Sequence, residues 1–273
     1  MILLVDKFPE LDKMLIQLLE SLEPEEWHKQ TVAKLWTVKD VAAHLLDGNI
    51  RNLSMLRDGY MGLKPEVNSY QELLDFLNGL NAEWVQAMKR VSPALLIDLL
   101  KHTGKPFNDY YASLDPHAKA QFSVAWAGEE ESSNWMHLAR EYTEKFLHQQ
   151  QIRDATGRQG LMTDEYYLPF LEVCMYALAH TLRDTPMEKG CVFKMNIVGE
   201  VSGEWLVQYN GEKWLRIKSS PDLPIETEVR IDSYAAWKLF SKSRRAKDLS
   251  DQIEISGNQA LGEKALEMVS FMA

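Results

Sequence analysis

The stretch EYTEKFLHQQQIRDA, residues 141–155, belongs to a segment whose periodicity predicts a long helix from about Ser133 to Thr156. Glu144 and His148 lie four positions apart in it. On a helix this spacing puts both side chains on one face, where they can reach a single metal ion. An ordinary carboxylate–imidazole pair on a helix surface has the same spacing. The rest of the sequence has to decide between these two interpretations.

Composition and charge restrict the class of protein. The chain of 273 residues is 45% hydrophobic and 26% charged, which is typical of globular proteins and long enough for two domains. The apolar runs are too short to span a membrane, and the N-terminus lacks the features of a secretion signal. The net charge of −10 disfavours nucleic-acid binding. We expect a cytoplasmic monomer or homodimer that acts on small molecules, without membrane or nucleic-acid partners.

The two cysteines, Cys174 and Cys191, show no metal-type spacing. Both lie among apolar residues, so we expect buried, unreactive thiols in a reducing compartment rather than a disulfide.

The first half of the chain predicts an up-down helical bundle. Apolar residues recur at three- and four-residue steps in four segments, residues 6–22, 37–56, 69–91 and 133–156. Thr37 and Asp40 resemble a capping box at the start of the second segment. Pro93 is expected to begin a further short helix, and residues 105–131 are predicted to form a long loop with local turns.

Residues able to bind a metal form one stripe along the last of these helices: His137, Glu141, Glu144 and His148. His44 lies on or beside the apolar face of the second helix, so its side chain is expected to point toward the bundle interior. Two imidazoles and a carboxylate suit zinc or a similar divalent ion and leave one coordination position open. Periodicity alone leaves open whether these residues are ligands or ordinary core and surface residues.

Two motifs resemble a known family. The stretch WTVKDVAAHLLDGN, residues 36–49, resembles the W-[ST]-x-x-[DE]-x-x-x-H signature of the DinB-like superfamily, and residues 141–157 resemble its E-x-x-x-H helix. Residues 126–128, Trp-Ala-Gly, fit its mycothiol-dependent maleylpyruvate isomerase branch. The resemblance implies that three side chains bind a divalent metal, namely His44, Glu144 and His148. Zinc is the expected ion, with nickel or another divalent ion as the alternative.

One residue departs from the pattern of this branch, whose members often carry aspartate three positions after the second histidine. Gln151 stands there in this chain, and its amide can orient a ligand imidazole without adding charge. His137 and Glu141 remain rival ligands, but a pair interaction at the helix surface is the favoured interpretation. Asp47 is a further candidate for orienting or supplementing the metal.

The second half of the chain predicts a different domain. Period-two alternation indicates strands at residues 193–197, 205–209 and 213–217, with Asn210-Gly211 as a type I′ hairpin turn. A helix in 163–184 precedes them, and a strand, a helix, a strand and a final helix over 259–271 follow. We predict an α+β domain with an antiparallel sheet. The expected domains are residues 1–160 and 161–273.

The stretch QIEISGNQALGEKALEMV, residues 252–269, resembles sterol-carrier-like domains, which follow the DinB-like bundle in this branch. The expected fold is therefore a DinB-like four-helix bundle followed by a sterol-carrier-like α+β domain.

The resemblance also implies a function. We expect a metal-dependent enzyme that uses a low-molecular-weight thiol for S-transfer or for thiol-assisted cis–trans isomerisation of a small electrophile. Arg216 and Arg230 are candidates for binding an anionic substrate. The alternative is a non-catalytic protein that binds a lipid or other apolar ligand, with a structural metal. A relic bundle without metal is a third possibility.

Overall fold

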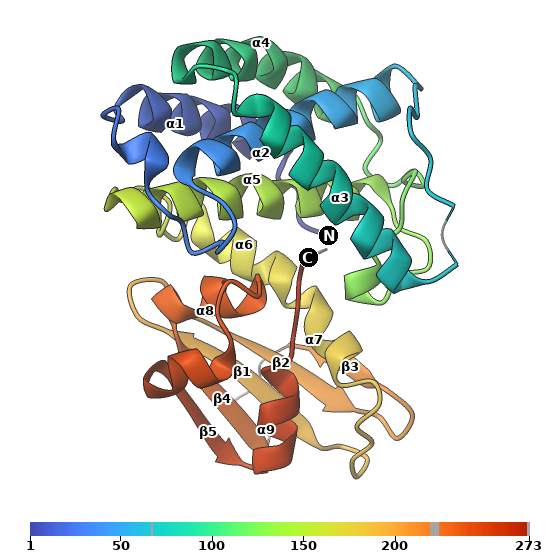
Figure 1. The fold of residues 1–273 in the computed structure, drawn as a ribbon. Coiled ribbons are helices and arrows are strands. Elements are labelled where there is room, and N and C mark those ends of the chain that lie inside the picture. The colour runs from blue at the N-terminus through green and yellow to red at the C-terminus, as the bar shows by residue number, and fades with distance from the viewer. Residues whose placement is uncertain (67, 219–223, 272–273) are drawn as a thin grey trace. The chain divides into compact units, whose positions relative to one another are not determined.

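The structure is a computed structural model that describes residues 1–66, 68–218 and 224–271 (Figure 1). The chain divides into two compact units. The first contains Met1–Phe122 and Glu131–Gln159, and the second contains Ser123–Glu130 and Gly160–Phe271. The predicted domain boundary after residue 160 stays a proposal, and the end of the predicted second domain lies outside the described residues. Within the described ranges, no helix combines the length and the apolar character needed to cross a membrane.

The first unit is helical (Figure 1). Its long helices are α1 (Phe8–Glu20), α2 (Val38–Asn52), α3 (Tyr70–Met88), α4 (Pro93–Ala112) and α5 (Asn134–Thr156). Short 3₁₀ turns occupy Val5–Lys7 and Glu26–His28, and a π-helical turn at Leu53–Arg57 extends α2. Helices α2 and α1 each pack on both α4 and α5, whereas α3 packs on α2. The predicted four-helix bundle is confirmed, with α4 rather than α3 as its fourth member.

The predicted loop over residues 105–131 is wrong in its first part. Helix α4 continues to Ala112 with Pro106 inside it. Proline lacks the amide hydrogen that would bond the carbonyl of His102, which normally destabilises a helix interior. The following turns bury the rings of Phe107 and Tyr111, each 1% exposed, in the bundle core. This burial outweighs the local cost of the proline.

The second unit contains an α+β fold (Figure 1). Its strands are β1 (Val192–Val198), β2 (Gly203–Tyr209), β3 (Trp214–Ile217), β4 (Thr227–Asp232) and β5 (Ile253–Gly257). Its helices are α6 (Tyr167–Cys174), α7 (Tyr176–Thr181), α8 (Ser233–Phe240) and α9 (Gln259–Ala265), with 3₁₀ turns at Ala125–Ala127 and Ala246–Gln252. The helix predicted over 163–184 is thus two helices that meet at Met175. The predicted final helix ends earlier, at Ala265.

The sheet is mixed, not wholly antiparallel as expected. The strand order is β3-β2-β1-β4-β5. Strands β1, β2 and β3 form an antiparallel meander, and β5 pairs antiparallel with β4. Strand β4 returns to the free side of β1 and runs parallel to it, with Met195 opposite Val229. Such a return depends on a crossover between distant segments, which local alternation does not report.

The hairpin between β2 and β3 is present, but its turn is not type I′ at Asn210-Gly211. A type I′ turn needs positive φ at both central residues. Among the described residues, Lys242 is the only non-glycine with positive φ. The Asn210 side chain instead accepts hydrogen bonds from the backbone N–H groups of Glu212 and Lys213, both at 2.9 Å.

Gly257 at the end of β5 provides a test of the sheet. Its φ is +90°, and an added Cβ would lie 2.0 Å from the carbonyl oxygen of Glu226. Because the clash is with backbone, we expect Gly257→Ala to lower the free energy of unfolding by about 3 kcal/mol or more. Gly211→Ala is the control, since its φ is also positive but its nearest contact would be 3.7 Å away. Equal losses in the two variants, measured by denaturant unfolding, would contradict this account.

Candidate metal centre

Helix α2 presents His44 to the bundle interior. A capping box begins the helix, because the Thr37 hydroxyl accepts from the Asp40 N–H and the Asp40 carboxylate accepts from the Thr37 N–H at 3.0 Å. The Trp84 indole donates to the carbonyl of Ala43 at 2.8 Å. The helix start and the neighbouring turn are therefore both anchored, which fixes the direction of His44.

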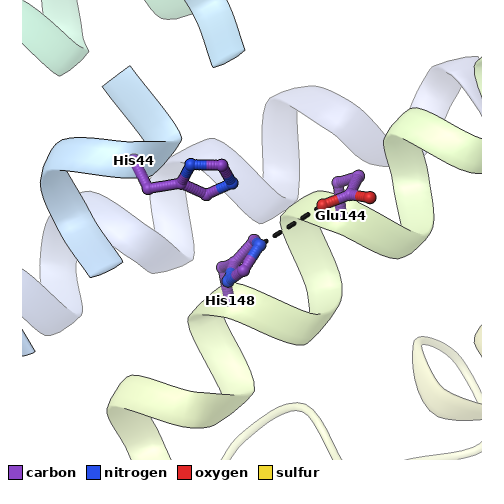
Figure 2. Close-up of side chains that lie close together, drawn as sticks. All are labelled: His44, Glu144 and His148. Atoms are coloured by element: carbon purple, nitrogen blue, oxygen red, sulfur yellow. Dashed lines mark ion pairs between the residues drawn. The ribbon is translucent and has the colours of Figure 1, made fainter. Parts of the chain in front are cut away.

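Helix α5 presents Glu144 and His148 to the same place (Figure 2). Glu144 Oε2 lies 3.3 Å from His148 Nε2. The other ring nitrogen, Nδ1, lies 2.9 Å from the Oε1 atom of Gln151. If Nδ1 carries the proton and donates it to this amide oxygen, Nε2 is left with a lone pair for a metal ion. Gln151 thus makes the contact expected of a residue that orients a ligand imidazole.

The structure brings His44, Glu144 and His148 together (Figure 2). One potential ligand atom from each lies within 4.8 Å of the other two. The two imidazole rings meet edge to face with centroids 4.5 Å apart. Two nitrogens and one carboxylate oxygen at this spacing fit a zinc-like divalent ion with an open coordination position.

The environment of His44 also suits a metal ligand. Its Nδ1 is buried and has no hydrogen-bond partner among the described residues. Burial lowers the pKa of His44 well below its ordinary value, and His148 and Arg51 lower it further. The imidazole is therefore neutral at pH 7, which is the form that binds metal ions. The ring can meet a cation without first losing a proton.

Trp36 is a residue of this site whose role the sequence did not reveal. Its ring centroid lies 4.7 Å from that of His44 and 6.0 Å from that of His148. The indole therefore packs beside both imidazoles. Its position directly before the Thr37 cap was the available signal, because the residue before a helix cap often packs back onto the first turns.

The rival residues on the α5 stripe are engaged elsewhere. The guanidinium of Arg140 lies 2.6 Å from His137 Nε2 and donates to Glu141 at 2.5 Å. Burial alone would raise the pKa of Glu141, but Arg140 and His137 outweigh it and hold that pKa below its ordinary value. Asn52 donates to the second oxygen of Glu141 at 3.2 Å. His137 and Glu141 thus form a buried pair with Arg140, not the surface pair that was expected.

The remaining predicted residues lie outside the triad. Asp47 is buried 3.5 Å from the Arg51 guanidinium, and burial raises its pKa while Arg51 opposes the rise. Arg216 on β3 forms an ion pair with Glu172 at 2.5 Å and lies over the ring of Tyr176 at 4.4 Å. Arg230 on β4 is exposed. Both arginines belong to the second unit, whereas the triad belongs to the first.

Comparisons with known proteins agree with the fold. The sequence family described as "Mycothiol maleylpyruvate isomerase N-terminal domain" matches residues 8–153. Crystal structures of the mycothiol-dependent maleylpyruvate isomerase and of its histidine-to-alanine mutant are similar, with a TM-score of 0.55 for each. Their identities are 12% and 11%, and the alignments cover 94% of this chain and 96% of the other. At such identities the likeness shows the fold alone.

A sterol carrier protein 2 from Yarrowia lipolytica, in its apo form, aligns with 40% of this chain and 96% of its own length, at 13% identity and a TM-score of 0.29. No curated protein matches the chain.

Gln151 gives a test of imidazole orientation. Gln151→Leu removes the acceptor for His148 Nδ1, so we expect metal affinity to fall roughly ten- to a hundredfold. Gln151→Glu keeps the acceptor and adds a negative charge, and should bind the metal at least as tightly as the native chain. Isothermal titration with zinc checks both. Equal affinities for the leucine variant and the native chain would contradict the assigned role.

Replacing His137 tests how a buried histidine changes the pH dependence of stability. Burial, with Arg140 nearby, lowers its pKa from 6.5 to about 4. The unfolded chain therefore binds more protons in this window, and stability present above pH 6.5 is lost as the pH falls toward 4. His137→Gln should remove up to about 3 kcal/mol of this pH-dependent loss. Unfolding of the chelator-treated protein measures it, with the exposed His102→Gln as control. Parallel pH profiles for native and H137Q chains would contradict the assignment.

Proposed function

The chain belongs to the mycothiol maleylpyruvate isomerase N-terminal domain family, and from this premise we propose a divalent-metal-dependent enzyme that uses a low-molecular-weight thiol. The reaction is S-transfer or thiol-assisted cis–trans isomerisation of a small electrophile. The main support for the proposal is that two imidazoles and a carboxylate, from α2 and α5, lie close enough together to bind one metal ion. We propose His44, Glu144 and His148 as the metal ligands, zinc as the first ion to test, and mycothiol, which the similar structures name, as the first thiol.

The chemistry of such a site is specific. A bound divalent ion lowers the pKa of a thiol and so favours the reactive thiolate. The thiolate sulfur adds to an activated carbon–carbon double bond, which becomes a single bond and can rotate. Expulsion of the same sulfur restores the double bond in the other geometry, and the thiol is regenerated. In S-transfer the adduct is instead retained, and the proton lost by the thiol is returned to the carbon next to the new carbon–sulfur bond.

Residues of the chain orient the proposed ligands and pack an apolar side chain beside them. His44 offers a neutral imidazole, and Gln151 orients the ring of His148. Trp36 packs beside both imidazoles. The Glu144 side chain is 31% exposed, compared with 10% for His148, so the glutamate is the more accessible of these two groups.

The proposed function also includes binding of an anionic substrate. Arg216 and Arg230 remain the candidates from the second unit. The charge of Arg216 is already balanced by Glu172 at 2.5 Å, whereas Arg230 is exposed. An arginine held by a carboxylate and an aromatic ring is well oriented but binds a further anion less strongly. We propose a cytoplasmic location, where low-molecular-weight thiols are reduced.

Replacing one ligand tests the proposal. We expect the native chain to bind one equivalent of divalent metal and to form thiol adducts or isomerised products. His148→Ala should lose both properties, at least a hundredfold in metal affinity, while remaining folded. Metal analysis, circular dichroism and mass spectrometry of anaerobic reactions with a panel of thiols and electrophiles provide the measurements.

His102→Ala is the matched control, since this histidine is exposed on α4. Two outcomes would overturn the proposal that the protein is an enzyme. In the first, the native chain purified without chelators carries no metal. In the second, it carries metal but reacts with no thiol. The second of these outcomes would favour a binding protein with a structural metal.

A further inference from the structure

Helices α2 and α5 are joined by polar contacts at more than one level. Three contacts follow one another along the two helices. The His44 ring contacts the His148 ring at the first level. Asn49 Oδ1 accepts a hydrogen bond from Lys145 Nζ at 3.0 Å at the second level, and Asn52 donates to Glu141 at the third. As the residue number rises along α2, the partner's number falls along α5. The two helices are therefore antiparallel, and the contacts share one register. The metal triad is one level of this series.

Lys145 is the centre of the middle level. Its side chain is only 9% exposed, yet its ammonium group is fully engaged. It donates to Asp12 of α1 at 2.8 Å and to Asn49 of α2 at 3.0 Å, and it lies 4.2 Å from the centroid of the Phe107 ring of α4. One side chain of α5 thus contacts each of the other three bundle helices. It stands directly after Glu144 and three residues before His148.

The hydrogen-bond partners of Lys145, Asp12 and Asn49, each form a further hydrogen bond. Asn49 donates to the Thr103 hydroxyl at 3.1 Å, and Asn108 donates to the second oxygen of Asp12 at 2.9 Å. Both bonds reach α4. The network therefore has few alternative arrangements that would satisfy its buried groups, because each group left unpaired carries a large desolvation penalty.

Metal binding needs this kind of register. A slide of one residue along a helix moves a ligand by about 1.5 Å and turns it by about 100°. Ligand distances in metal sites tolerate deviations of only about 0.2 Å. Apolar contacts are non-directional, whereas a buried charge with fixed hydrogen-bond partners can specify one register.

We propose that Lys145, Asp12 and Asn49 are positioning residues of the metal centre, which lock α2 against α5 so that His44 meets Glu144 and His148. The inference rests on the proposed metal site. None of the three residues is among the proposed ligands. Their effect is on the distance and angle between ligands carried by two different helices.

Gly104 of α4 offers a way to disturb this lock without changing a charge. A Cβ at this position would lie 2.9 Å from Asp12 Oδ2, too close for the carboxylate to stay where Lys145 and Asn108 hold it. A groove of about 490 Å³, lined by Asp12, Asn49 and Asn108 among others, opens at this point. A displaced carboxylate can therefore turn into solvent, and the variant can remain folded.

The first experiment compares Gly104→Ala with Gly79→Ala. Gly79 lies inside α3, and a Cβ there would meet nothing within 4 Å. Both changes favour helix formation, so neither is expected to unfold the protein. We expect cobalt(II) affinity to fall roughly tenfold or more in G104A alone, with a changed visible d–d spectrum of the bound ion. Unchanged affinity and an unchanged spectrum in G104A would overturn the proposal.

The second experiment replaces the network by apolar groups, in the variant Asp12→Leu/Asn49→Leu/Lys145→Met. Buried polar networks replaced in this way often keep or gain stability, so a folded protein is expected. Its control is Lys105→Met/Asp109→Leu, an ion pair at the groove rim with side chains 80% and 62% exposed. We expect the triple variant, and not the control, to bind cobalt(II) at least tenfold more weakly and with an altered spectrum.

The outcomes separate the two proposals. If the native chain binds no metal ion, the proposed function fails and this inference fails with it. If the native chain binds cobalt(II) and either G104A or the folded triple variant binds it equally well with the same spectrum, the metal site stands and only the positioning role is overturned.

Discussion

The structure of the first unit depends on one constraint, the burial of a polar helix. Sixteen of the 23 residues of α5 are buried. They include the polar side chains of His137, Glu141, Thr143, Lys145, His148, Gln149, Gln150, Gln151 and Arg153. A buried polar group without a partner costs about 1–3 kcal/mol, so the neighbouring helices must supply partners. Gln149 donates to the carbonyl of Leu11, and Arg153 to that of Met14. The arrangement around α5 is therefore determined by hydrogen bonding as much as by apolar packing.

Much of the bundle and of the candidate site could be predicted from the sequence, for a local reason. The four-residue step from Glu144 to His148 and the place of His44 on its apolar stripe are properties of single helices. The capping box at Thr37 is equally local and is present. The role of Lys145 could not be predicted in this way. A lysine usually marks a solvated surface, and its partners Asp12 and Asn49 are remote in sequence.

The wrong predictions from the sequence occur where interactions between distant segments decide the structure. Pro106 is a local signal that ends helices, but the burial of Phe107 and Tyr111 by other helices overrides it. In the second unit the alternation of apolar residues located the strands, since this pattern needs only the strand itself. The parallel pairing of β1 with β4 joins segments about 35 residues apart, which no local pattern encodes.

The charge of the candidate centre links its architecture to its proposed chemistry. A divalent ion bound by two imidazoles and one carboxylate would keep one net positive charge, and Gln151 would add none. The nearby charges largely cancel in pairs, since Arg51 faces Asp47 and Arg140 faces Glu141. The positive charge of a bound ion would therefore not be neutralised by its surroundings, and a low dielectric would strengthen its field. On the proposed function, such a site would favour an anionic fourth ligand such as a thiolate over a neutral one. With a carboxylate at position 151, as in many members of the resembled branch, that preference would be weaker, because the added negative charge would partly compensate the ion.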